Sequence, residues 1–143
     1  MARRIQPVAP ITWRDGVHIT GTPIWCDARR RRDVCFVSSA DRVGKAGHDQ
    51  LIGTPIALAL LGAGAGNLAV PLHRPFTLGT LRLELLDAGR TLGAASLHVA
   101  IGGRGVLYAG EVRAGAELRA CDAVVVAAPI DRALPALAEV SGE

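Results

Sequence analysis

The chain has 143 residues, of which 50% are hydrophobic, 20% are charged and 3% are aromatic. This composition excludes a disordered chain and predicts one globular domain over residues 1–143, with an aliphatic core and a flexible N-terminus over residues 1–10. The net charge of +3 is too small to indicate a nucleic-acid or membrane partner by itself.

The apolar runs of the sequence are too short for a membrane span. The longest one starts at Ile56 and is interrupted at Gly62, well short of the roughly 20 residues that a spanning helix needs. The basic residues Arg3 and Arg4 are followed by two prolines rather than by the apolar segment of a signal peptide. We therefore expect a cytoplasmic protein without a membrane partner.

Short strands separated by turn residues are predicted for the N-terminal part of the chain. They cover residues 11–13, 17–20, 24–26 and 34–37, and Asp15-Gly16 between the first two favours a hairpin. A helix is predicted to begin after Thr54 as the N-cap, with Pro55 at its first position, and to end at the glycines of residues 62–66.

Alternating aliphatic residues predict strands in the C-terminal part. One face of residues 80–86 carries Leu81, Leu83 and Leu85, and one face of residues 95–101 carries Leu97, Val99 and Ile101. Residues 102–105 predict a turn into a paired strand at 106–109, and a strand at 123–127 precedes a short helix over about 131–140. This order predicts a mixed α/β (α+β) fold with a mostly antiparallel or mixed sheet and one or two helices.

Three stretches, taken in chain order, carry a resemblance to a known family. The first is Ile24-Trp25-Cys26-Asp27 followed by residues 35–44, the second is residues 87–95, and the third is residues 106–113. Together they resemble the metallo-β-lactamase fold, in particular its nucleic-acid-processing branch of ligase-associated exonucleases and RNA 3′-end processing nucleases. Because the chain ends at Glu143, the resemblance implies half of an αββα sandwich.

The metal-ligand positions of this family are occupied by unsuitable residues. The ligands of the HxHxDH motif fall on Ser39, Asp41, Val43 and Gly44, the later histidine falls on Arg90, and the bridging aspartate falls on Glu111. Valine and glycine have no side-chain donor, and a guanidinium repels a divalent cation. Since a two-metal centre needs convergent imidazoles and carboxylates, the resemblance implies a degenerate site with no catalytic residues and no cofactor.

A catalytically inactive protein of this fold is expected to act as a structural or binding subunit. The half-sandwich implied by the resemblance would leave an apolar sheet face exposed, and such a face needs a cover. We expect a homodimer or a heteromeric protein partner, for example a nuclease with an intact HxHxDH motif.

Two alternative functions remain open. One is a phosphodiesterase or nuclease with a rebuilt single-metal site for zinc or manganese around Asp41, His48 and Glu111. The other is a non-catalytic nucleic-acid-binding module whose arginines bind phosphate. Its candidate residues are Arg29, Arg30, Arg31, Arg32, Arg42, Arg90 and Arg113. The competing interpretation is structural, because a run of charge between strands is usually a solvated loop and Arg90 is able to pair with Glu111 or Asp41.

Two further features of the sequence are interpreted as structural. Trp13 and Trp25 are expected to pack within the protein rather than stack on bases. Cys26, Cys35 and Cys121 lack the spacing of a CxxC pair or a metal finger, and we expect them to be small buried side chains.

Overall fold

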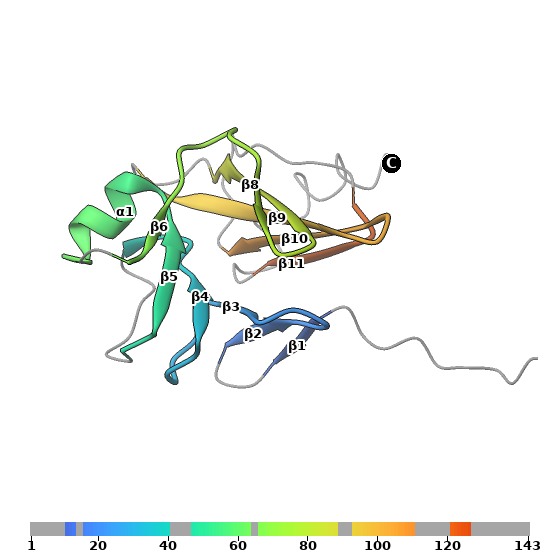
Figure 1. Ribbon diagram of the computed structural model, residues 1–143, viewed down its shortest axis with the longest axis horizontal. Coiled ribbons are helices and arrows are strands. Elements are labelled where there is room, and N and C mark those ends of the chain that lie inside the picture. The colour runs from blue at the N-terminus through green and yellow to red at the C-terminus, as the bar shows by residue number, and fades with distance from the viewer. Residues whose placement is uncertain are drawn as a thin grey trace, which may run out of the picture.

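The computed structural model describes residues 11–13, 16–40, 47–63, 66–88, 93–110 and 121–126. Within these ranges the chain forms two β-sheets and one short helix (Figure 1). In Figure 1 the first sheet, coloured blue to green, lies below the second sheet, coloured yellow to orange. The mixed α+β prediction is confirmed, and the arrangement is consistent with half of an αββα sandwich.

The first sheet has six strands in sequence order. They are β1 (Ile11–Trp13), β2 (Val17–Ile19), β3 (Ile24–Cys26), β4 (Val34–Phe36), β5 (Gln50–Gly53) and β6 (Leu68–Ala69). Strands β1, β2 and β3 pair antiparallel, as the predicted hairpin requires, whereas β3, β4, β5 and β6 pair in parallel. The carboxyl ends of the four parallel strands therefore lie at one edge of the sheet. Strands β5 and β6 were not predicted from the sequence.

The second sheet has five strands in the order β11-β10-β9-β8-β7. They are β7 (Phe76–Leu78), β8 (Leu81–Asp87), β9 (Ala95–Ile101), β10 (Arg104–Gly110) and β11 (Ala123–Val126). The pairs β7–β8, β8–β9 and β9–β10 are antiparallel, whereas β10 and β11 are parallel. The turn between β9 and β10 is made by Gly102 and Gly103 alone, at φ angles of 52° and 83° that favour glycine. The predicted hairpin is confirmed, with β10 starting earlier at Arg104; strand β7 was not predicted.

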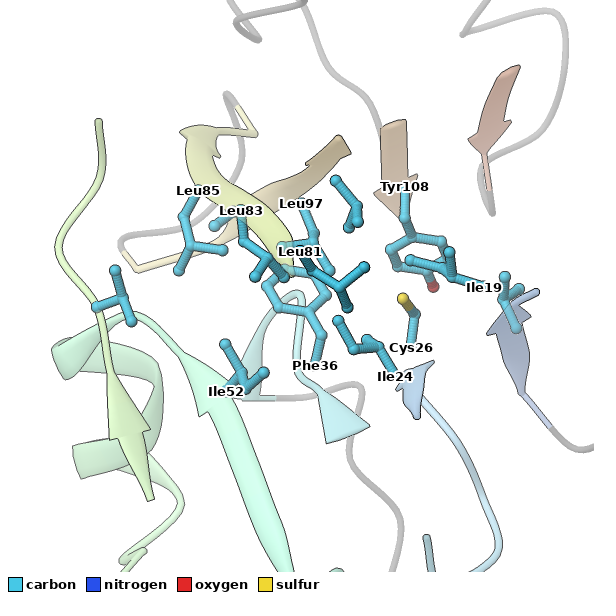
Figure 2. Packing of buried hydrophobic residues seen from close by; sticks show 14 residues of the cluster. Ile19, Ile24, Cys26, Phe36, Ile52, Leu81, Leu83, Leu85, Leu97 and Tyr108 are labelled. Atoms are coloured by element: carbon cyan, nitrogen blue, oxygen red, sulfur yellow. The ribbon is translucent and has the colours of Figure 1, made fainter. Parts of the chain in front are cut away.

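The core lies between the two sheets (Figure 2). From the second sheet, the alternation of β8 and β9 points Leu81, Leu83, Leu85, Leu97 and Val99 inward, as predicted. From the first sheet, the facing residues include Ile19, Ile24, Cys26, Phe36 and Ile52. All ten are at most 6% exposed, which corresponds to about 1.5–3 kcal/mol of stabilisation for each large aliphatic or aromatic side chain.

This packing corrects the expectation of an uncovered apolar sheet face. Within the described residues, the apolar faces of the two sheets cover each other, so the inner face of neither sheet calls for a partner. The reason given for a homodimer or a heteromeric partner was therefore wrong, although the partner itself stays a prediction.

The helix α1 (Pro55–Leu60) begins as predicted. The hydroxyl oxygen of Thr54 accepts a hydrogen bond from the Ala57 N–H at 3.1 Å, and proline occupies the first turn. The helix ends before Gly62, whose φ is 69°. No helix in the described part of the chain is long and apolar enough to cross a membrane. The second predicted helix, over about 131–140, lies outside the described residues.

Candidate functional site

The candidate site lies at the carboxyl ends of the parallel strands of the first sheet. Asp27 follows β3, Ser38 and Ser39 come shortly after β4, and Thr54 follows β5. Because β3, β4 and β5 are parallel, these residues meet at one edge, where open sheets with parallel strands generally place their ligand-binding residues. We call Asp27, Ser38, Thr54 and the residues that they contact the carboxyl edge.

The carboxylate of Asp27 is the most highly connected group of this edge. Its Oδ1 accepts a hydrogen bond from the Ser38 N–H at 2.9 Å, and its Oδ2 accepts bonds from the hydroxyls of Ser38 and Tyr108, both at 2.6 Å. Hydrogen bonds to an ionised carboxylate are short and about twice as strong as neutral ones. Tyr108 belongs to β10, so this carboxylate links the first sheet to the second.

The backbone of Asp27 is also unusual, with a φ of 48°. Aspartate is one of the few residues other than glycine that visit this left-handed region. The Asp27 N–H donates to the Phe36 carbonyl at 2.8 Å, and the positive φ turns the carboxylate toward Ser38. A residue other than glycine in this left-handed region strains the backbone, and such strained residues are typical of functional sites.

Two more hydrogen bonds attach the second sheet to the same edge. The Ala95 N–H donates to the Ser38 carbonyl at 2.8 Å, and the Thr54 hydroxyl donates to the Gly93 carbonyl at 2.6 Å. Gly93 has a φ of 86°, and a Cβ there would lie 2.9 Å from a methyl group of Ile56. Glycine is thus required both by the backbone conformation and by the close approach to α1.

These contacts bring together the described parts of the three sequence stretches that carry the family resemblance. Ser38 belongs to the first stretch, Ala95 to the second and Tyr108 to the third. Of the predicted degenerate metal-ligand positions, only Ser39 is described, and it lies buried at this edge with 3% of its surface exposed. Asp41, Arg42, Val43, Gly44, Arg90, Glu111 and Arg113 lie outside the described residues.

The donors at this edge do not fit a metal centre. Among the described residues, no group of three or more histidine, cysteine, aspartate or glutamate side chains could hold a metal ion. Ser39 offers a hydroxyl where the family motif has an imidazole, and the carboxylate of Asp27 accepts hydrogen bonds from three protein donors.

The thiols of Cys26 on β3 and Cys35 on β4 are unreactive. Burial raises the pKa of the Cys35 thiol to about 12, and the negative charge of Asp27 acts in the same direction. Burial and the same carboxylate also raise the pKa of Cys26 well above its ordinary value. Because the thiolate is the nucleophile and the metal ligand, neither side chain is reactive at neutral pH. The interpretation as small buried side chains is confirmed for Cys26 and Cys35 but is wrong for Cys121, which is only partly buried.

A second candidate region surrounds the charged connector between β3 and β4. We call residues 28–33 the arginine loop. Arg29, Arg30 and Arg31 are exposed, and Arg31 pairs with Asp49 through a hydrogen bond from its Nε at 3.0 Å and an ion pair from its terminal nitrogen. The hydrogen bond from Arg31 lowers the pKa of Asp49, so this carboxylate stays charged at all physiological pH values.

His48 holds the two ends of the arginine loop. Its Nδ1 accepts a hydrogen bond from the Arg32 N–H at 3.0 Å, and its Nε2 lies 3.1 Å from the Ala28 carbonyl. An acceptor Nδ1 carries no proton, so the ring is neutral and its Nε2–H donates to Ala28. Burial lowers the pKa of His48 and favours this form. Both nitrogens are occupied, which leaves His48 without a lone pair for the metal of the single-metal alternative.

The fourth arginine of the loop covers an aromatic ring. The guanidinium carbon of Arg32 lies 3.5 Å from the centroid of the Trp25 ring, a close cation–π contact. The ring of His18 stacks on Trp25 at a centroid distance of 4.6 Å and an interplanar angle of 19°. His18 and Trp25 face each other across the β2–β3 pair, which places both rings on the face of the sheet opposite to the core. The sequence analysis named these arginines but missed their contacts with Trp25 and His48.

Comparison with known proteins gives only distant likenesses, all of them to solved structures. No protein-family model matches the sequence, and the search of the curated proteins returned no match. Among the solved structures that match is the Zn(2+)-bound PqqB from Methylobacterium extorquens, with 15% sequence identity and a TM-score of 0.43. The match covers 55% of this chain and 38% of that protein, so the chain spans well under half of its length.

Proposed function

We propose that this chain is a catalytically inactive protein of the metallo-β-lactamase fold that acts as a structural or binding subunit. One observation carries the proposal: the described parts of three stretches that resemble the family motifs, far apart in the sequence, meet at the carboxyl edge through Ser38, Ala95 and Tyr108. The bond between Tyr108 and Asp27 alone joins residues 81 positions apart. Contacts of this kind are expected if the three motifs descend from one metal-binding centre.

The chemistry of the matched positions supports the loss of catalysis. A two-metal hydrolase places its ions about 3.5–4 Å apart and uses them to activate a water and stabilise the leaving group. At four of the ligand positions, a valine, a glycine and an arginine supply no lone pair for a metal, and a serine supplies only a neutral hydroxyl. No hydrolytic step is therefore assigned to this chain.

For the partner, we propose self-association, with a protein that keeps an intact HxHxDH motif as the alternative. The exposed surface of α1 supports a protein contact, because Ile56 and Leu60 are 40% and 69% exposed there. Large apolar side chains that remain in water beside each other favour association.

Metal content and mass in solution test this proposal directly. The full chain is purified without a metal-chelating tag, its transition metals are counted by elemental mass spectrometry, and its mass is measured by light scattering. Far less than one metal per chain and a dimeric mass are expected. One tightly bound zinc or manganese per chain, with phosphodiesterase activity that Glu111→Gln abolishes, would overturn the proposal in favour of a rebuilt single-metal site.

A restored variant gives a second test that does not depend on a negative result. The ligand types of the family are returned at the matched positions by the combined substitutions S39H, D41H, V43D, G44H, R90H and E111D. If the three stretches form a degenerate metal centre, the restored chain binds zinc stoichiometrically while the parent chain does not. The single substitution R90H serves as the control, because one added histidine supplies too few ligands for a four-coordinate zinc site, and it is expected not to bind zinc stoichiometrically.

A further inference from the structure

The arginine loop is an unusually short connection between parallel strands. Strands β3 and β4 are parallel neighbours, so the chain must return from the carboxyl end of one to the amino end of the other. Such crossovers usually take a dozen or more residues, commonly with a helix. Here residues 27–33 are sufficient. The short connection leaves the loop little freedom to change its path.

Several contacts fix the ends of this loop. His48 binds the Ala28 carbonyl and the Arg32 N–H, and the Asp49 N–H donates to the Arg32 carbonyl at 3.1 Å. Below the loop, the Ala28 N–H points at the Cys35 sulfur at 3.5 Å. The backbone is thus held on both sides of the exposed arginines. A ligand that binds there does not have to order the loop, which removes part of the entropic cost of binding.

The charge of the loop is strongly positive at its exposed centre. Arg29, Arg30 and Arg31 follow one another, and the neighbouring acidic groups are Asp33 and Asp49, of which Asp49 pairs with Arg31. Three successive guanidinium groups carry more positive charge than a single small anion neutralises. A linear polymer with regularly spaced anions can meet each of them.

We infer that the arginine loop binds the phosphodiester backbone of nucleic acid. A guanidinium matches the geometry of phosphate with two parallel N–H donors and keeps its charge at all relevant pH values. A nucleic-acid strand carries a regular series of phosphates and so offers one to each exposed guanidinium of the loop. The ring of Trp25 is already in contact with Arg32 and His18, so recognition rests on phosphate rather than on stacked bases and is independent of sequence.

This inference rests on the proposed function only for the role of a binding subunit. The two fail separately, because metal content and chain mass are measured without nucleic acid, whereas phosphate binding is measured without reference to metal. A metal-loaded chain whose arginine loop binds nucleic acid would overturn the first and leave the second standing.

The test uses fluorescence anisotropy of a labelled oligothymidylate with the full chain over a series of salt concentrations. The double variant Arg29→Gln/Arg30→Gln is compared with Arg82→Gln/Arg104→Gln, which removes the same charge from exposed positions of the second sheet. We expect the loop variant to bind on the order of tenfold more weakly at about 50 mM salt. Its slope of log affinity against log salt should fall by roughly 1.4, about 0.7 for each lost phosphate contact on a single strand. The control should match the parent chain.

Three outcomes would overturn the inference. No binding at low salt would do so, as would equal weakening by both double variants, which would show that only net charge matters. Tighter loop-dependent binding of polyglutamate than of oligothymidylate would show that the loop recognises an acidic protein. Thermal unfolding of both variants checks that they fold, which is expected because the substituted side chains are exposed.

Discussion

The carboxyl edge and the arginine loop lie next to each other on β3 and β4, yet they use charge in opposite ways. At the edge, one carboxylate is surrounded by three protein donors and joins two sheets. In the loop, the anchors are backbone groups and an uncharged imidazole, and the side chains of Arg29, Arg30 and Arg31 are exposed. The carboxylate of Asp27 stabilises the fold because it is hydrogen-bonded within it. The arginines of the loop are exposed on a fixed backbone, so a ligand can reach their charges.

Removing the carboxylate of Asp27 should have the largest effect. Asp27→Ala leaves the hydroxyls of Ser38 and Tyr108 without their acceptor and puts alanine at a φ of 48°. We expect a loss of about 3–4 kcal/mol in the free energy of unfolding, measured by urea denaturation. Asp27→Asn tolerates the same backbone and should lose about half as much, so the pair separates the carboxylate from the strain. Asp33→Ala, at an exposed carboxylate, should change stability by less than about 0.5 kcal/mol; an equal loss there would refute the special role of Asp27.

The hydrogen bond from Tyr108 to Asp27 should contribute less to stability than all the hydrogen bonds of this carboxylate together. Tyr108→Phe removes only the hydroxyl that donates to Asp27 and keeps the edge-to-face contact of the ring with Phe36, at a centroid distance of 6.2 Å. We expect a loss of about 1.5–2 kcal/mol in urea unfolding, because the carboxylate keeps its two bonds to Ser38. A combined Tyr108→Phe/Asp27→Asn variant should lose less than the sum of the two single losses, and simple additivity would contradict a direct interaction.

The anchor of the arginine loop should show a dependence on pH. Because the pKa of His48 is lowered in the folded protein, the unfolded chain binds more protons as the pH falls below about 6.5. The contribution of His48 is therefore complete above this pH and is lost as the pH falls toward the folded value. His48→Gln should cost about 1 kcal/mol near pH 7.5, and the gap from the parent chain should narrow near pH 5. A gap that widens at low pH would contradict the neutral ring of His48.

The smallest effect is expected for the ion pair on the loop surface. The side chains of Arg31 and Asp49 are 70% and 45% exposed, so water and salt screen their attraction. A double-mutant cycle with Arg31→Gln and Asp49→Asn should give a coupling of about 0.5 kcal/mol or less that decreases at high salt. A coupling well above 1 kcal/mol would mean that this pair, rather than His48, fixes the loop.

Local patterns predict the strands of the second sheet better than those of the first. Leu81, Leu83 and Leu85 alternate regularly over a seven-residue strand, and Thr54-Pro55 marks the start of α1. The shortest missed strand of each sheet gives no periodic signal. Strand β6 of the first sheet has two residues, and β7 of the second sheet has three between Pro75 and Gly79. Strand β5 was not predicted, because its apolar residues lie directly before the start of helix α1.

The candidate site was predictable in its position but not in its contacts. An aspartate directly after a buried strand, as at Asp27, is a recognisable signal for the carboxyl end of a sheet. Its bond with Tyr108 spans 81 positions, and the contact of Arg32 with Trp25 depends on the path of a seven-residue crossover. Neither distance follows from a periodicity or a motif, because tertiary packing brings these residues together.

The link between Asp27 and Tyr108 also has a consequence for the order of events during synthesis. When β3 and β4 have left the ribosome, Tyr108, whose hydroxyl donates to the Asp27 carboxylate, has not yet been synthesised. Most of the apolar residues that cover the first sheet are also still missing. Closing so long a loop is slow compared with forming a hairpin. The N-terminal strands should therefore gain protection from proteolysis only after β10 has emerged, and the two sheets should then become resistant together.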